Sequence, residues 1–197
     1  DLISSVENVK LEKEPVWVSK LVAAAVANHE EYLRTKIRPP LPLDVLAKVE
    51  FLGELYLGLD VGRKKDMSVI WLDQKIENVL VTAAVIELKR MPYFVQEHVL
   101  HTLLKRKEMR RACIDETGIG SQLAEGAHDL VGDRAEPITF SAESKETLAV
   151  DLKRNFDDHG SQIPADATIR NSLHSVKKYA TTTKHFRFDA ERTDATG

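Results

Sequence analysis

The sequence predicts an α/β fold in which a mixed β-sheet is flanked by helices, with an N-terminal helical arm in front of it. Three strand-like apolar runs follow one another closely after residue 54, which is typical of an antiparallel meander. Beyond them, segments of helical period alternate with short apolar strands, a pattern that favours parallel pairing. A proline-rich connector precedes the first strand, so we expect the main domain to be joined to an arm.

Composition bounds the class of protein without deciding its function. The 197 residues are 43% hydrophobic and 30% charged, enough for one well-buried core with an appendage. The net charge of −3 does not exclude nucleic acid, because a basic face can coexist with clustered acids. Cys113 is the only cysteine, which excludes an intramolecular disulfide and favours an intracellular setting. The chain has no apolar run of membrane-spanning length and begins without Met, so a piece of a longer protein is expected.

Residues 1–54 are expected to form the arm. A helix is predicted from Val16 to Arg34, because Pro15 suits the start of a helix. The prolines of Ile37–Pro42 then make a stiff, extended connector. The main domain is expected over residues 55–197.

The main domain should begin with three strands and continue with alternating helices and strands. The expected strands are 55–62, 67–73, 77–88, 110–115 and 136–140; the expected helices run from Pro92 to about Lys107, over about 119–131, from Ser144 to Phe156 and from Ala167 to Tyr179. An alternating run at 185–189 follows. The order β-β-β-α-β-α-β-α is the ribonuclease H arrangement.

Asp60 is the first candidate for a functional site. It stands at the end of the apolar run Leu55–Val61, which has the length of a buried strand, and Gly62 begins a turn. An unpaired buried carboxylate is costly, so Asp60 needs a metal, a cation or hydrogen-bond donors. The next run, Met67–Leu72, would complete a hairpin with Asp60 near its bend. The alternative role for Asp60 is to cap the Gly62 turn through backbone N–H groups.

Asp115 repeats this pattern in a second strand. The short apolar strand from Arg111 ends on Asp115 and is followed by Gly118, Gly120 and a helical pattern. Sites in parallel sheets lie just beyond the carboxyl ends of the strands. Two carboxylates there repel each other unless a cation lies between them, and such ligands suit Mg²⁺ or Mn²⁺. The alternative is that Asp115 caps the following helix.

Basic residues near the first acid suggest contact with a phosphate backbone. Arg63, Lys64 and Lys65 occupy the turn after Asp60, and phosphate contacts dominate sequence-independent DNA affinity. The alternative is an ordinary solvated turn. Further basic candidates are Lys145, Lys153, Arg154, Lys177 and Lys178.

Three segments together resemble the nuclease domain of the large terminase subunit of tailed bacteriophages, most closely the Mu-like group. They are Gly58–Asp66, Asp115–Gly120 and Arg187–Thr193, within a match from about Leu55 to Gly197. The resemblance implies a ribonuclease H-like endonuclease that cuts concatemeric double-stranded DNA with little sequence specificity during genome packaging. It implies residues 1–54 as the linker from a preceding ATPase domain. It also implies a phage portal and a small terminase subunit as partners of the full-length protein, no membrane, and the cytoplasm of the bacterial host.

By this resemblance Asp60 and Asp115 match the family's first two metal-binding acids, and Asp66 resembles an additional catalytic acid. The implied cofactor is a two-metal site of Mg²⁺ or Mn²⁺, which can activate water and stabilise the leaving oxygen. The family's third essential acid would follow Gly197, so we expect the second metal to bind weakly here. The tail residues Asp189, Glu191 and Asp194 are possible substitutes.

Three other functions remain open. A resolvase or integrase shares the predicted fold, and a DNA-binding or motor-docking module needs no catalysis. An ATP-binding fold of the actin and sugar-kinase type also places Asp and Gly between two strands, but it needs two domains and small residues where Arg63–Lys65 stand. Cleavage of plasmid with Mn²⁺ would favour the nuclease, and a nucleotide-dependent thermal shift would favour the ATP-binding fold.

Overall fold

The computed structural model describes residues 16–17, 34–35, 50–62, 67–89, 91–180 and 186–190. The chain divides into two compact units. The sheet unit comprises Pro15–Glu77 and Val81–Thr139; the C-terminal unit comprises Asp1–Glu14, Asn78–Leu80 and Phe140–Gly197. No helix among the described residues is long and apolar enough to cross a membrane.

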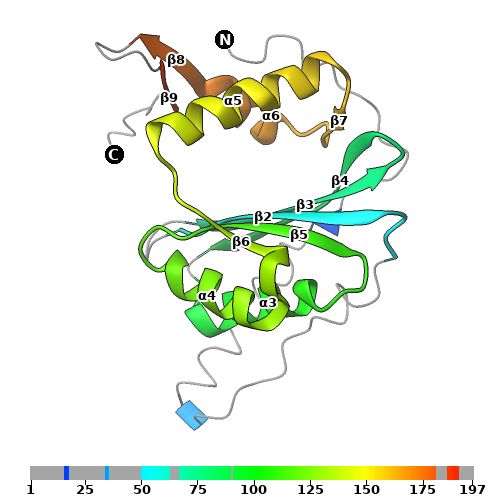
Figure 1. Cartoon of the computed structure of the whole chain (residues 1–197), viewed down its shortest axis with the longest axis vertical. Helices are drawn as coiled ribbons and strands as arrows, with labels where there is room; N and C mark the ends of the chain where they lie inside the picture. The colour runs from blue at the N-terminus through cyan, green and yellow to red at the C-terminus, as the bar shows by residue number, and fades with distance from the viewer. Residues whose placement is uncertain are drawn as a thin grey trace. The chain divides into compact units, whose positions relative to one another are not determined.

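The sheet unit contains a mixed β-sheet with the strand order β1-β4-β3-β2-β5-β6. β2 is antiparallel to β3 and parallel to β5; β5 is parallel to β6, and β1 is parallel to β4. The predicted mixed sheet is therefore confirmed (Figure 1). The strands are β1 (Val16–Trp17), β2 (Glu54–Asp60), β3 (Met67–Ile76), β4 (Val79–Lys89), β5 (Met109–Asp115) and β6 (Ala135–Ile138).

Two helices, α3 (Tyr93–Leu104) and α4 (Gly120–Val131), cover one face of this sheet, as Figure 1 shows. Side chains alternate across a strand, so one set of β2 residues faces these helices. Leu55, Leu57 and Leu59 are buried in that core, whereas Asp60 is exposed. The strand was expected to be buried throughout, but only its core face is. We call the opposite face, which bears Asp60, the second face.

The N-terminal prediction is wrong at its first residues. Val16 and Trp17 form strand β1 and pair with Ala84 and Val85 of β4, because the edge of the sheet supplies backbone partners that a helix start would not use. Arg34 is helical, and the residues of the predicted helix between 17 and 34 lie outside the described residues. The division at residue 54 stays a prediction.

The C-terminal unit contains α5 (Ala142–Asp157), α6 (Ala167–Ser175) and a two-stranded sheet of β8 (Val176–Ala180) and β9 (Phe186–Ala190). Strand β7 (Ser161–Gln162) pairs with β4, where Leu80 N–H donates to Gly160 C=O at 2.9 Å. The helix expected to reach Tyr179 ends at Ser175 instead. The reason is non-local: residues 176–180 find antiparallel partners in β9, which contains most of the alternating run.

Candidate metal centre at the strand ends

The site begins with two acids that end neighbouring parallel strands. Asp60 is the last residue of β2 and Asp115 is the last residue of β5. The residues before them, Leu59 and Ile114, are register partners on the core face. Because side chains alternate, both carboxylates therefore leave the sheet on the second face, at the same edge. The structure brings the two predicted acids together.

The charge of the second acid acts on the carboxyl of Asp60. Partial burial raises the pKa of the Asp60 carboxyl above its ordinary value, and the negative charge of Asp115 raises that pKa further. Both effects disfavour the ionised form of Asp60. A cation between the two carboxylates would remove the repulsion, so the residues present fit a divalent ion with oxygen ligands.

The capping alternatives are only partly realised. The Gly62 N–H donates to the Ser68 Oγ at 3.0 Å, so it is not capped by Asp60. Asp115 Oδ1 accepts from the Thr117 N–H at 2.9 Å, which makes a local turn, but α4 begins after Ile119 with no side-chain cap. Within the described part of the chain, no hydrogen bond reaches the second carboxylate oxygen of Asp115. That oxygen is available to an ion.

The residues after Asp115 fix the end of its strand. The Glu116 N–H donates to the C=O of Ile138, the last residue of β6, at 3.1 Å. The Thr139 hydroxyl donates to a Glu116 carboxylate oxygen. Glu116 is thereby bonded to residues at the end of β6. Asp115 ends a strand that pairs with β2 on one side and with β6 on the other.

A buried polar network that the sequence analysis missed holds the bend after Asp60. The hydroxyl of Ser68, which accepts from Gly62, donates to Gln96 Oε1 at 2.8 Å, and Gln96 Nε2 donates to the Met91 C=O at 2.9 Å. Ser68 is 1% exposed and Gln96 is 5% exposed. A signal was present in the sequence, since Ser68 alternates with Ile70 at core positions of an apolar run. That position indicates a buried hydroxyl, but it does not indicate which residue the hydroxyl contacts.

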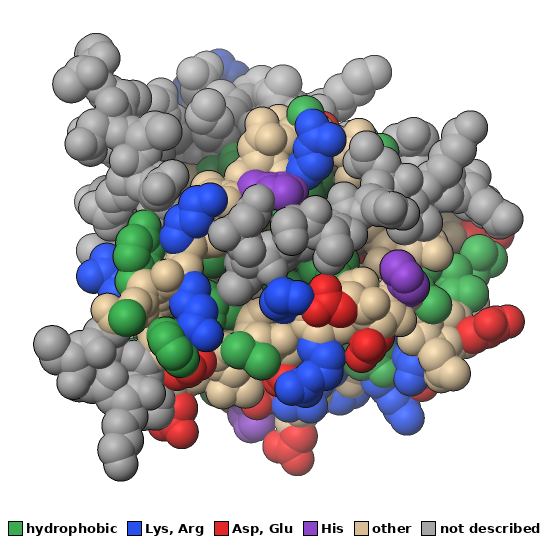
Figure 2. All heavy atoms as spheres, turned by 90° about the horizontal axis from the view of Figure 1, so that it is seen from above, with side chains coloured by type: hydrophobic (Ala, Val, Ile, Leu, Met, Phe, Trp, Pro, Cys, Tyr) green, Lys and Arg blue, Asp and Glu red, His purple; other side chains and the backbone are tan. Residues whose placement is uncertain are grey.

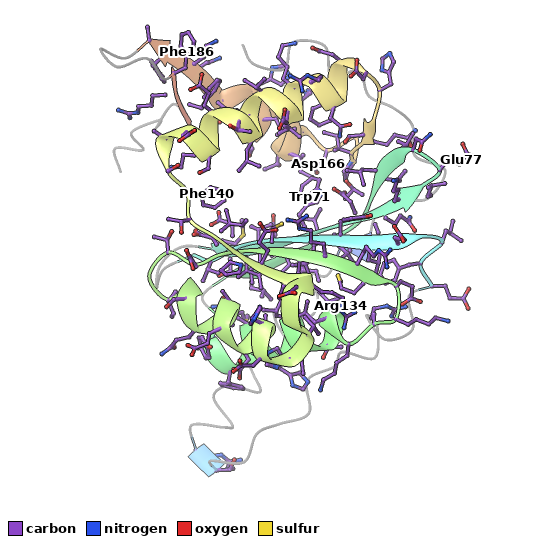
Figure 3. All side chains as sticks on the ribbon, viewed as in Figure 1. Trp71, Glu77, Arg134, Phe140, Asp166 and Phe186 are labelled. Atoms are coloured by element: carbon purple, nitrogen blue, oxygen red, sulfur yellow. The ribbon has the colours of Figure 1, made fainter. Side chains whose placement is uncertain are left out.

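A second acid with a raised pKa, Asp73, has a structural role. Burial raises the pKa of the Asp73 carboxyl, while hydrogen bonds from Trp71 and Thr82 lower it. Trp71 Nε1 donates to Asp73 Oδ1 at 2.8 Å and Thr82 Oγ1 donates to the same oxygen at 3.0 Å. Trp71 extends from β3 on the second face, away from α3 and α4 (Figure 3). Asp73 is satisfied within the protein and needs no ion.

The other predicted site residues lie outside the described residues or in the C-terminal unit. Arg63, Lys64, Lys65 and Asp66 lie outside the described residues, as do the side chain of Asp189 and all of Glu191 and Asp194. Lys145 is exposed on α5 in the C-terminal unit. On the face in Figure 2, basic and acidic side chains are interspersed rather than gathered into one basic stripe. Across the described ranges, no three His, Cys, Asp or Glu side chains are grouped to hold a metal ion.

Comparison with known proteins gives a consistent result. The model of the family described as terminase RNaseH-like domain matches residues 57–197. None of the curated proteins compared matches the chain.

Solved structures agree with the family match. The large terminase nuclease from thermophilic phage G20c is similar with a TM-score of 0.58 and 22% identity, over 70% of this chain and 73% of that one. The same nuclease with bound magnesium is similar with a TM-score of 0.58 and 22% identity, over 72% of this chain and 74% of that one. The large terminase nuclease domain of Thermus phage P74-26 is similar with a TM-score of 0.52 and 18% identity, over 70% of each chain. At these identities the structures show a shared fold.

Proposed function

The chain belongs to the family of terminase RNaseH-like domains, and on that premise we propose that it is the metal-dependent endonuclease domain of a phage DNA-packaging terminase. The observation that supports this most directly is the pair Asp60 and Asp115 at the ends of parallel strands, where the charge of one raises the pKa of the other. A divalent cation between the two carboxylates would offset their repulsion. The Mu-like group stays a prediction.

The proposed reaction is hydrolysis of a DNA phosphodiester. Water adds to phosphorus, one deoxyribose oxygen leaves, and that oxygen takes up a proton. A divalent ion, Mg²⁺ or Mn²⁺, would supply positive charge for the phosphate and a more acidic bound water. Asp60 and Asp115 would hold it from rigid strand ends, so that little reorganisation is needed during the reaction.

Further residues are assigned by the same proposal. Asp66 would act as an additional catalytic acid, and a second ion, if it binds, would depend on an acid beyond the Asp60–Asp115 pair. Arg63, Lys64, Lys65 and Lys145 would contact the phosphates of double-stranded DNA. Such contacts read no bases, which suits the cutting of concatemers with little sequence specificity. Packaging also requires a portal and a small terminase subunit as partners, in the cytoplasm of the bacterial host.

One observation favours a second candidate, a DNA-binding or docking module without catalysis. The described part of the chain offers two acids at the site, not three. Both candidates predict DNA binding, but only the nuclease predicts strand breaks.

The test is nicking of supercoiled plasmid with Mn²⁺ and with EDTA. We expect nicking with Mn²⁺, and its loss in Asp60→Asn and in Asp115→Asn, because each change removes a charge with little change in volume. The loss should be at least about 100-fold, as for a misplaced or missing catalytic group. Asp73→Asn is the matched control, since it changes an acid about 13 Å along the same sheet. Nicking at the parental rate in both strand-end variants would show that these acids are not catalytic.

A further inference from the structure

Gly120, the first residue of α4, lies unusually close to the backbone of the strand that bears Asp115. A methyl group at this position would overlap the carbonyl oxygen of Asp115 and lie 3.0 Å from its carbonyl carbon. These are backbone atoms, which cannot rotate away as the end of a side chain can. Only glycine lets the helix approach the end of β5 so closely.

The same position also lies against the strand that bears Asp60. The methyl group would be 3.3 Å from Cγ2 of Val61, tighter than an ordinary contact. Val61 directly follows Asp60 and is 7% exposed. The first turn of α4 therefore rests on the backbone that ends one strand and on the side chain that follows the other.

Each strand end is also positioned by a hydrogen bond of its own. The end of β5 is tied to β6 by the hydrogen bond from Glu116 N–H to Ile138 C=O. The chain after β2 is tied by the hydrogen bond from Gly62 N–H to the buried Ser68. Added volume at Gly120 would press on both strand ends, and a shift of either end alters the separation of the two carboxylates.

We propose that Gly120 is a positioning residue, which sets the spacing of the Asp60 and Asp115 carboxylates so that they share one divalent ion. The inference rests on the proposed function and goes beyond it in assigning a role to a residue that offers no ligand. Residues that orient metal ligands typically change metal affinity by about 10- to 100-fold when altered.

Other glycines at α4 provide matched controls. A methyl group at Gly126, in the same helix, would make only ordinary contacts, at 3.7 Å to His101 and 3.9 Å to Glu97. Gly132, which follows the helix, has a φ of 61° and open space around it. Gly132→Ala therefore strains the backbone without pressing on either strand, and it reports the effect of lost stability alone.

The experiment is a calorimetric titration of the protein with Mn²⁺, with the melting temperature of each variant measured in parallel. We expect Gly120→Ala to weaken Mn²⁺ binding about 10- to 100-fold, while Gly126→Ala and Gly132→Ala keep the parental Kd. Plasmid nicking by Gly120→Ala should require correspondingly more Mn²⁺. A parental Kd in Gly120→Ala, or an equal loss of affinity in Gly132→Ala, would overturn the inference and leave the proposed function standing.

If Gly120→Ala does not fold, a second pair of variants tests whether the contact of α4 with the strand ends sets the affinity for Mn²⁺. Val61→Ala removes the side chain on which α4 rests next to Asp60, and Val99→Ala makes the same change in α3, far along the chain from both acids. We expect Val61→Ala to weaken Mn²⁺ binding about tenfold more than Val99→Ala. Equal Kd values would overturn the inference, whereas absence of Mn²⁺ binding in the parental protein would overturn the proposed function itself.

Discussion

Two acids on the same face of the sheet show how the surroundings of a residue decide its role. Asp60 and Asp73 both have a raised pKa, and burial is the largest cause for each. Asp73 receives hydrogen bonds from Trp71 and Thr82, which offset part of that cost. For Asp60 the second cause is the charge of Asp115, which adds to the cost. Of these two acids, Asp60 would gain more from a nearby cation.

This difference leads to a prediction about stability. Since the pKa of Asp60 is higher in the folded than in the unfolded protein, the folded protein binds the proton more tightly, and stability is lost as pH rises through the interval between the two pKa values. Without metal at neutral pH, Asp60→Asn should therefore melt at a higher temperature than the parental protein. The difference should vanish below the ordinary pKa of an aspartate, near pH 4.

The measurement is thermal unfolding by circular dichroism in EDTA, from acid to neutral pH. Adding Mn²⁺ should raise the melting temperature of the parental protein and leave that of Asp60→Asn nearly unchanged. A variant less stable than the parental protein at neutral pH in EDTA would contradict the account of Asp60.

At the scale of elements, Asp60 lies at the end of β2 in the β2–β3 pair, and a hydrogen bond connects β3 to helix α3. Asp60 is opposite Val69 in the antiparallel register. The chain between them is tied to α3 through Ser68 and Gln96, both buried. Gly62 and Ser68, which lie just after Asp60 and at the start of β3, are therefore anchored to the core.

Ser68→Ala tests this anchor. The change leaves the Gly62 N–H and the Gln96 side chain without the buried hydroxyl, which should cost about 1–3 kcal/mol of unfolding free energy. Ser172→Ala, at an exposed position of α6, should change it by less than about 0.5 kcal/mol. Urea denaturation of both variants provides the measurement. Equal effects of the two substitutions would show that the network does not stabilise the hairpin.

At the scale of the whole molecule, the negative net charge would oppose the proposed binding of DNA, so that affinity would have to come from local groups. The chain has a net charge of −3, and basic and acidic side chains are interspersed on the face in Figure 2. The basic turn Arg63–Lys65 adjoins Asp60 in sequence, so its positive charge would lie close to the phosphate that is cut. We therefore expect this turn to contribute most of the electrostatic binding.

Replacement of Arg63, Lys64 and Lys65 by alanine should weaken binding to duplexes of any sequence and lower its salt dependence. The slope of log K against log salt should become shallower by about 0.9 for each phosphate that the protein no longer neutralises. The charge-matched control replaces Lys75, Lys105 and Lys107, which are exposed toward the opposite ends of β2 and β5. Fluorescence anisotropy at several salt concentrations measures the affinity and the slope for both triple variants. If the control changed the slope by the same amount, DNA binding would depend on the overall charge and not on residues 63–65.

Much of the fold follows from local patterns. The alternation of leucines in β2, the apolar runs of β3 and β5 and the glycines after Asp115 predict strands and their ends, because these signals involve residues close together in the chain. The placement of Asp60 and Asp115 at neighbouring strand ends follows in turn from the predicted topology. Residues 176–180 show the limit, since a local helical pattern is overridden by pairing with β9.

By itself, then, the sequence determined the α/β class, the order of its main strands and the two acids at their ends. Only the tertiary structure decided that Asp60 lies on the second face, that Ser68 bonds to Gln96, and that Gly120 touches both strand ends. The physical reason is separation along the chain. Ser68 and Gln96 are 28 residues apart, and Gly120 meets Val61 across the β2–β5 pair. Such contacts form only when the whole sheet and its helices come together, so no local pattern of residues can specify them.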